Sequence, residues 1–345
     1  MRKNSQTLTT QSIPALIKQL AIPASIGMFF NTMYNVVDTF YAGLISTQAI
    51  SALTLSFMIF FLIIGFGYGF SSAITALLGN ALGKKRYKLA SIYAHKGLIF
   101  VPLIGLTLSI IGYFFAPSLF MFLGAKDEYL QISLDYINPI LFGAIFFMFN
   151  FSLNSILIAT GDTKTYRNSL IFGFFANLAL NPLFMYGFLF VPAMGIKGIA
   201  FATVLIQIIN MFYLFYKVLQ TKLIHFDKLE YFIPNLRIYK LFFTHGIPSS
   251  LNMLTMAIGS LILTYFVSHY GIQAVAGYGI GYRVEQLMLL PALGLSTAVL
   301  ALVSNNFGAK KYDRVIETLK VSLKYGFIIA TVGIIFLTIL GRLII

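Results

Sequence analysis

The chain has 345 residues, of which 59% are hydrophobic and 10% are charged. Soluble domains carry nearer ~25% charged residues, so this composition excludes a soluble globular protein and predicts a polytopic membrane protein. Cysteine is absent and the four histidines are scattered, which excludes a disulfide framework and a cysteine or histidine metal centre.

Apolar stretches of at least ~20 residues predict spanning helices along the whole chain. We expect nine of them, and hence an all-α membrane helix bundle. The N-terminal stretch has no cleavage site of small residues, so it is interpreted as a retained first helix. Pro23 and Pro248 are expected to kink their helices. The predicted spans are 13–42, 50–80, 94–118, 133–158, 167–190, 195–218, 240–268, 274–304 and 321–343.

The sequence contains an internal repeat at a spacing of 225 residues. Residues 21–90 align without a gap with 246–315, with 17 identities in 70 pairs. A repeat of this length in a membrane chain indicates a duplicated helix bundle. Six spans per copy give both copies the same orientation. We therefore predict two parallel-repeat lobes, a six-helix lobe over 1–225 and an incomplete second lobe of about three helices over 226–345.

Basic residues gather on one side of the predicted membrane. Twenty of the 24 fall in the N-terminus and alternate loops, and three fall on the other side. This asymmetry predicts a cytoplasmic N-terminus. It also explains the net charge of +14 without a nucleic-acid partner.

One acid stands out inside the predicted spans. A carboxylate at bilayer depth costs ~2.5–3.5 kcal/mol, so it needs a partner or a function. Asn31, Asn35 and Asp38 follow the i, i+4, i+7 spacing that lines one helical face. The equivalent of Asp38 in the second copy is Leu263. The stripe is either an interhelical hydrogen-bonding surface or, as we favour, a proton or cation site at Asp38, with Na⁺ as a possible ligand.

Further polar residues inside the first six spans extend this hypothesis. Asn177 and Asn181 lie at i, i+4 in the fifth span, where they suit either helix packing or function. Asn150 and Asn154 repeat the spacing in the fourth span. Carboxylate, amide and hydroxyl oxygens suit a hard cation, and one carboxylate suffices for a proton. The oxygen-rich pocket is completed by Thr203 and Tyr34.

Arg283 and Glu285 lie inside the eighth span. At i, i+2 they point to different faces, so they are either structural charges paired with neighbouring helices or residues of substrate binding or gating. We find no catalytic motif, and the chain is not expected to be an enzyme or to hold a cofactor.

Several segments together resemble one transporter family. They are Tyr34-Asn35-Val36-Val37-Asp38-Thr39-Phe40-Tyr41-Ala42-Gly43, residues 80–85, residues 159–164, Asn177 to Leu183, residues 195–203 and Arg283-Val284-Glu285. This combination is similar to the MATE (multidrug and toxic compound extrusion) transporters, and to their DinF-like branch because the seventh span lacks an acid.

The resemblance implies twelve helices in two lobes around a central cavity, in a bacterial plasma membrane. It implies export of small organic cations, in exchange for H⁺ or Na⁺, by alternating access. Asp38 matches the family's acid on helix one, whereas Asn181 stands where many DinF-like members have a second acid. Besides organic cations and membrane lipids no partner is expected, and the protein is expected to be monomeric.

Two alternatives remain open at this stage. One is a lipid-linked oligosaccharide flippase of the same superfamily, which would need basic residues in its cavity. The first lobe offers none inside the membrane and the second offers only Arg283. The other is a non-transporting fragment, since the pattern of the repeat predicts three further helices after residue 345.

Overall fold

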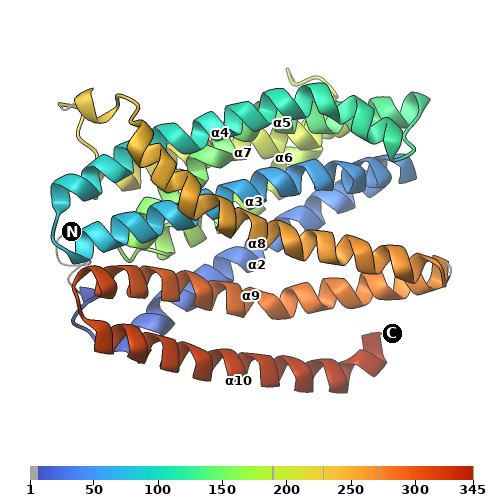
Figure 1. Ribbon diagram of the computed structural model, residues 1–345. Helices are drawn as coiled ribbons and strands as arrows, with labels where there is room; N and C mark the ends of the chain where they lie inside the picture. The colour runs from blue at the N-terminus through green and yellow to red at the C-terminus, as the bar shows by residue number, and fades with distance from the viewer. Residues whose placement is uncertain (1–6, 189, 228, 271, 345) are drawn as a thin grey trace.

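The computed structural model describes residues 7–188, 190–227, 229–270 and 272–344. In these residues the chain forms nine long helices, joined by short loops and one 3₁₀ turn, η1 (Leu229–Tyr231). Figure 1 shows them packed side by side as one bundle. The long helices are α2 (Ile13–Ile45), α3 (Thr47–Gly83), α4 (Tyr87–Phe122), α5 (Asp127–Ala159), α6 (Lys164–Tyr186), α7 (Ile196–Leu219), α8 (Leu236–Ser268), α9 (Ile272–Gly308) and α10 (Tyr312–Ile344).

The predicted fold class is confirmed. Within the described residues, eight of the long helices are long and apolar enough to cross a membrane. Most helices extend beyond the predicted spans, because basic residues that mark the membrane surface continue the helix instead of ending it. The largest difference is α10, which begins at Tyr312 and not near residue 321. Helices α2 and α8 continue through Pro23 and Pro248, and a kink at either residue stays a prediction.

Equivalent glycines of the repeat make equivalent contacts between the two copies. A Cβ on Gly69 of α3 would lie 2.5 Å from the backbone nitrogen of Ser250 on α8. A Cβ on Gly294 of α9 would lie 2.7 Å from the backbone nitrogen of Ser25 on α2. Only glycine allows backbones to approach this closely. The 225-residue spacing thus relates two reciprocal helix pairs.

The same reciprocity recurs at the helix ends. Gly83 packs on the backbone of Asn305, and Gly308 packs on the backbone of Asn80. We call the four glycines Gly69, Gly83, Gly294 and Gly308, with the backbones they touch, the glycine seam. Gly83 and Gly308 join α3 to α9 next to the basic loops, whereas Gly69 joins α3 to α8 and Gly294 joins α9 to α2.

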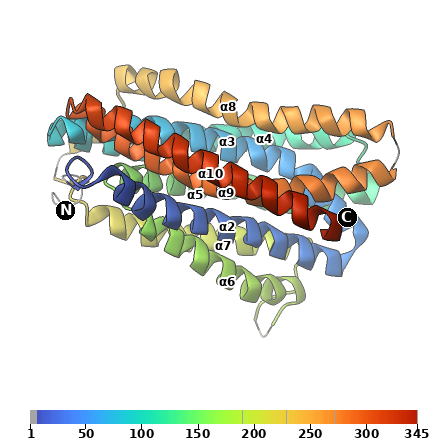
Figure 2. The same cartoon turned by 90° about the horizontal axis from the view of Figure 1, so that it is seen from below.

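The first halves of α2 and α8 each pack on helices of the other copy. Phe242 of α8 is buried with Phe70 and Phe100 of the first copy. Leu16 of α2 is buried in a cluster with Leu295 of α9. Figure 1 shows α8 crossing α3 and α2 crossing α9, and the helices of each pair are in contact; Figure 2 gives the view from below. The first half of one helix in each copy thus packs against the other copy. The proposed division into two lobes at residue 225 stays a prediction.

The loop that joins the two copies is docked on α4. The Ser91 hydroxyl donates to the carbonyl of Leu223 at 2.6 Å, and the His95 ring contacts the backbone of His225. The Lys96 ammonium donates to the carbonyls of Glu230 and Ile233. Lys96 is one of the twenty basic residues that the sequence assigns to the N-terminal side of the membrane. Its side chain is only 4% exposed, because the loop covers it and the two backbone carbonyls accept hydrogen bonds from its ammonium group.

Candidate functional site

The candidate site lies where α2, α6 and α7 meet. Asp38 comes from α2, Asn177 and Asn181 from α6, and Thr203 from α7, and all four are buried. The i, i+4 spacing puts both asparagines on one face of α6, so both reach the same point on α2. Asp38 is 4% exposed and therefore does not face lipid.

Three side-chain donors converge on the carboxylate of Asp38. Asn177 and Asn181 donate their amide N–H groups to Oδ1 at 2.8 and 2.9 Å, and Thr203 donates its hydroxyl to Oδ2 at 3.2 Å. The two asparagines also bond each other, at 3.2 and 3.4 Å. Hydrogen bonds to a charged acceptor are about twice as strong as neutral ones. The arrangement therefore stabilises an ionised carboxylate without a cationic partner.

Asp38 forms no salt bridge with any described residue. The ion pair found among the described residues joins Lys197 to Asp135 at 3.2 Å and does not include Asp38. A carboxylate held by neutral donors is free to take up a positive charge, whereas one locked against an arginine is not. The site thus keeps its capacity to bind a proton or a metal cation.

Two tyrosines border the carboxylate. The hydroxyl of Tyr34, one turn before Asp38, is buried and has no hydrogen-bond partner among the described atoms. Tyr136 of α5 lies within electrostatic reach of Asp38. The sequence hypothesis included Tyr34 but missed Tyr136, because no spacing rule links residues of distant helices. The Tyr34 hydroxyl nevertheless lies next to Thr203 and Asn177, which places it in the same polar cluster as Asp38.

The other residues of the predicted stripe are not part of this cluster. Asn31 is exposed, and Asn35 donates its amide to the Asn31 carbonyl at 3.0 Å along its own helix. The three residues share a helical face, as predicted, but only Asp38 lies at the level where α6 and α7 supply partners.

Asn150 and Asn154 form a second polar position in the same copy. The Asn150 amide donates to the side-chain oxygen of Gln207 at 2.8 Å and to its carbonyl at 2.9 Å. The side-chain oxygen of Asn154 is buried without a partner among the described atoms. Gln207 was missed, although its i+4 relation to Thr203 puts both on one face of α7 and could have indicated it.

Of the two predicted residues of α9, Glu285 is not part of this cluster. Glu285 is exposed and makes no salt bridge with the described residues. The side chain of Arg283 lies outside the described residues. Their roles in substrate binding or gating stay predictions.

The donor set at Asp38 suits small hard cations. Turning an asparagine side chain by half a rotation replaces its N–H donors by the amide oxygen. The same four residues could then present carboxylate, amide and hydroxyl oxygens, which are ligands of hard metal ions. Within the described residues, no group of three or more His, Cys, Asp or Glu side chains could hold a metal.

Comparison with known proteins places the chain in a family. The MatE family model matches residues 23–183 and 248–345. The "Probable multidrug resistance protein YoeA" of Bacillus subtilis is 30% identical over 97% of this chain and 74% of that protein. The "FAD transporter" of Shewanella oneidensis is 25% identical over 94% of this chain and 72% of that protein.

A solved structure has the same fold. It is the "Outward-facing conformation of a multidrug resistance MATE family transporter of the MOP superfamily". The two superpose with a TM-score of 0.89 at 26% identity, over 99% of this chain and 75% of that one. The all-helical membrane bundle thus agrees with sequence and structural similarity alike. The chain belongs to the MATE family and is a multi-pass membrane transporter for small molecules.

Proposed function

We propose that this protein exports small organic cations across a bacterial plasma membrane in exchange for inward H⁺ or Na⁺, with Asp38 as the coupling residue. One observation carries the proposal. The carboxylate of Asp38 is buried in the first copy, held by three neutral donors and paired with no described cation.

The coupling step follows from electrostatics. While Asp38 is ionised, its negative charge attracts an organic cation in surroundings of low dielectric constant. Binding of H⁺ or Na⁺ removes that net charge and favours release of the cargo. The ~2.3 kcal/mol per 100 mV that an inward-moving charge gains is lost again by a monovalent cation moving outward, so the inward concentration gradient of H⁺ or Na⁺ drives the exchange. Either ion can supply the energy, because the asparagine amides can donate to the carboxylate or turn their oxygens towards a metal ion.

The cargo class follows from the same charge. A single buried acid beside Tyr34 and Tyr136 offers negative charge and aromatic faces, which attract lipophilic cations. The name of the YoeA relative refers to drug resistance, which agrees with such a cargo. We also assign the chain to the DinF-like branch, since no acid is found in residues 240–268.

Alternating access requires the two copies to separate at one end of the bundle and close at the other. The seam contacts of Gly83 and Gly308 hold the two copies together at the end beside the basic loops. With a cytoplasmic N-terminus, this is the cytoplasmic end. We infer that neutralisation of Asp38 is transmitted through α2, whose first half packs against α9, and that the seam then opens.

A drug-efflux assay tests this proposal. Bacteria lacking their own exporters would express the chain or its Asp38→Asn variant and be loaded with ethidium. We expect energised export from the wild type and background leakage from the variant, at equal membrane expression. Undiminished export by Asp38→Asn would rule out the coupling assignment, and no export by the wild type would rule out the cargo.

A further inference from the structure

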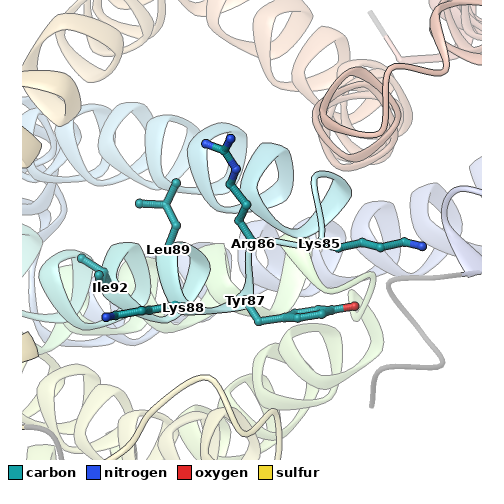
Figure 3. A pocket seen from close by; sticks show the side chains of 6 residues that line it. All are labelled: Lys85, Arg86, Tyr87, Lys88, Leu89 and Ile92. Atoms are coloured by element: carbon teal, nitrogen blue, oxygen red, sulfur yellow. The ribbon is translucent and has the colours of Figure 1, made fainter.

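We propose that the turn between α3 and α4 binds the phosphate headgroup of an anionic membrane lipid. Figure 3 shows this surface pocket of about 530 Å³. We call it the cationic pocket, and its lining consists of Lys85, Arg86, Tyr87, Lys88, Leu89 and Ile92. The proposal is independent of the transport mechanism at Asp38.

The three cations of the pocket have no internal counter-charge. Lys85, Arg86 and Lys88 are exposed, and none forms a salt bridge with a described carboxylate. The sequence holds no Asp or Glu between Asp38 and Asp127, a stretch that contains all of α3 and α4. These three cations within four residues extend from the turn in different directions, Lys85 opposite to Lys88 (Figure 3), and leave Arg86 and Lys88 unpaired among the described residues and able to attract an external anion.

The position of the turn favours a lipid as the source of that anion. Helices α3 and α4 are both candidate membrane spans, so the turn between them lies on one side of the membrane. Lys and Arg side chains at such positions reach the headgroup level while their stems cover apolar surface. Anionic headgroups attract basic segments at this depth.

The floor of the pocket supplies a second argument for a lipid over a free phosphate. Leu89 and Ile92 are three residues apart on one face of α4 and are half-buried, and Tyr87 lies beside them. A free phosphate would gain nothing from this apolar surface. The glycerol and the first methylenes of a phospholipid would cover it while the phosphate meets the cations at the rim.

The equivalent turn of the second copy shows what such cations do when the chain itself supplies the partners. Arg86 corresponds to Lys311, whose ammonium donates to the Thr9 carbonyl at 2.7 Å. Leu89 corresponds to Arg314, whose guanidinium donates to the Gln11 carbonyl at 2.6 Å. The N-terminal segment thus occupies that turn.

The second copy also differs at the position equivalent to Lys88, which is occupied by Asp313. An acid there lowers the positive charge of the turn. Of the two related turns, only the one between α3 and α4 combines three unpaired cations with an apolar floor. This difference points to an external ligand at the first turn and to internal anchoring at the second.

A lipid titration on the purified full chain tests the proposal. Bound phosphatidylglycerol would be counted by native mass spectrometry in a neutral detergent. The Arg86→Gln/Lys88→Gln variant should bind it about 30-fold more weakly than the wild type, from the loss of two charges near the headgroup. Lys84→Gln/Lys310→Gln removes the same charge at positions that do not line the pocket, and should bind as the wild type does. Circular dichroism would verify that both variants are folded.

Four outcomes would overturn the proposal. The first is equal binding by the wild type and Arg86→Gln/Lys88→Gln. The second is an equal loss in Lys84→Gln/Lys310→Gln, which would mean that only total charge matters. The third is equally tight binding of zwitterionic phosphatidylcholine. The fourth is displacement of the lipid by glycerol 3-phosphate or inorganic phosphate at matching concentration, which would make a soluble phosphate the ligand.

Discussion

Helices α2 and α8 occupy equivalent places in the repeat but differ in chemistry. Each brings a serine backbone against a glycine of the other copy, Ser25 on Gly294 and Ser250 on Gly69. Only α2 carries an acid into the bundle. The equivalent of Asp38 on α8 is Leu263, whose side chain is 55% exposed. The duplication thus preserves a packing contact in both copies and places the ionisable site in one.

This difference separates two kinds of residue. Seam residues fix how the copies fit together, so changes at equivalent positions should have equal effects. Site residues bind the ion, so changes at equivalent positions should have unequal effects. Two results would contradict this distinction. One is unequal effects of changes at equivalent seam residues, and the other is equal effects of changes at Asp38 and at its equivalent Leu263.

The largest effect is expected from moving the acid. Asp38→Leu should reduce energised export to background, because no other described acid lies in the cluster. Adding Leu263→Asp should not restore it, because an exposed acid at that depth lacks the amide donors and costs about 2.5–3.5 kcal/mol. Ethidium efflux at matched expression measures both.

The control for this exchange is Leu263→Asn in the wild-type chain, which should keep most of the export. Restored export in the exchanged variant would show that either copy can house the coupling residue. The asymmetry between α2 and α8 would then have no functional meaning.

The next effect concerns the seam. Gly69→Ala and Gly294→Ala each force a Cβ into a serine backbone, 2.5 and 2.7 Å from its nitrogen. Overpacking of this kind costs about 1–3 kcal/mol, so both variants should melt at lower temperature and export more slowly, to a similar extent. Gly259→Ala, on the same helix as Ser250 but with open space around it, is the matched control. A strong effect at one seam glycine and none at the other would contradict the reciprocal contact.

A smaller effect is expected from the donors to Asp38. Asn177→Ala and Asn181→Ala each remove one bond to the carboxylate, and a bond to a charged group contributes about 1.5–3 kcal/mol. Each variant should therefore lower gradient-driven export about tenfold or more without abolishing it, since the remaining donors still hold the acid. Initial export rates measure this. Asn35→Ala serves as control, because Asn35 bonds only the Asn31 carbonyl. Equal losses in all three variants would contradict the assigned cluster.

The smallest functional effect is expected at Gln207. Gln207→Ala removes the acceptor of the Asn150 amide and leaves a buried polar group short of one partner, which costs about 1–3 kcal/mol of folding stability. We expect a lower melting temperature and nearly normal export. Loss of export at unchanged stability would instead place Gln207 in the ion path, beside Asp38.

The sequence predicted the fold and the centre of the site for identifiable physical reasons. Hydrophobic length located the nine helices, and the cost of a buried charge selected Asp38. The i, i+4 rule paired Asn177 with Asn181. The sequence could not predict the height of each residue along the bundle axis, and hence which residues of neighbouring helices lie beside it. Asn31 and Asn35 share a face with Asp38 but lie where no donors reach them, and Tyr136 has no local signal.

Loop docking was equally hidden from the sequence. Lys96 resembled its neighbours in a basic loop, yet the inter-copy loop covers it with backbone carbonyls. Every segment of the chain has backbone carbonyl groups, so no pattern of residues predicts which of them will accept a hydrogen bond from Lys96. The glycine seam could be predicted in part. The repeat showed that its four glycines occupy equivalent positions, but it did not show that each packs on the backbone of the other copy.

The most direct test of the account uses purified protein in proteoliposomes, with an imposed pH or Na⁺ gradient and no other energy source. The wild type should move ethidium against its concentration gradient when one of the two ion gradients is applied, and Asp38→Asn should do so under neither. Uphill transport by Asp38→Asn under either gradient would contradict the claim that this buried carboxylate couples the ion to the cargo.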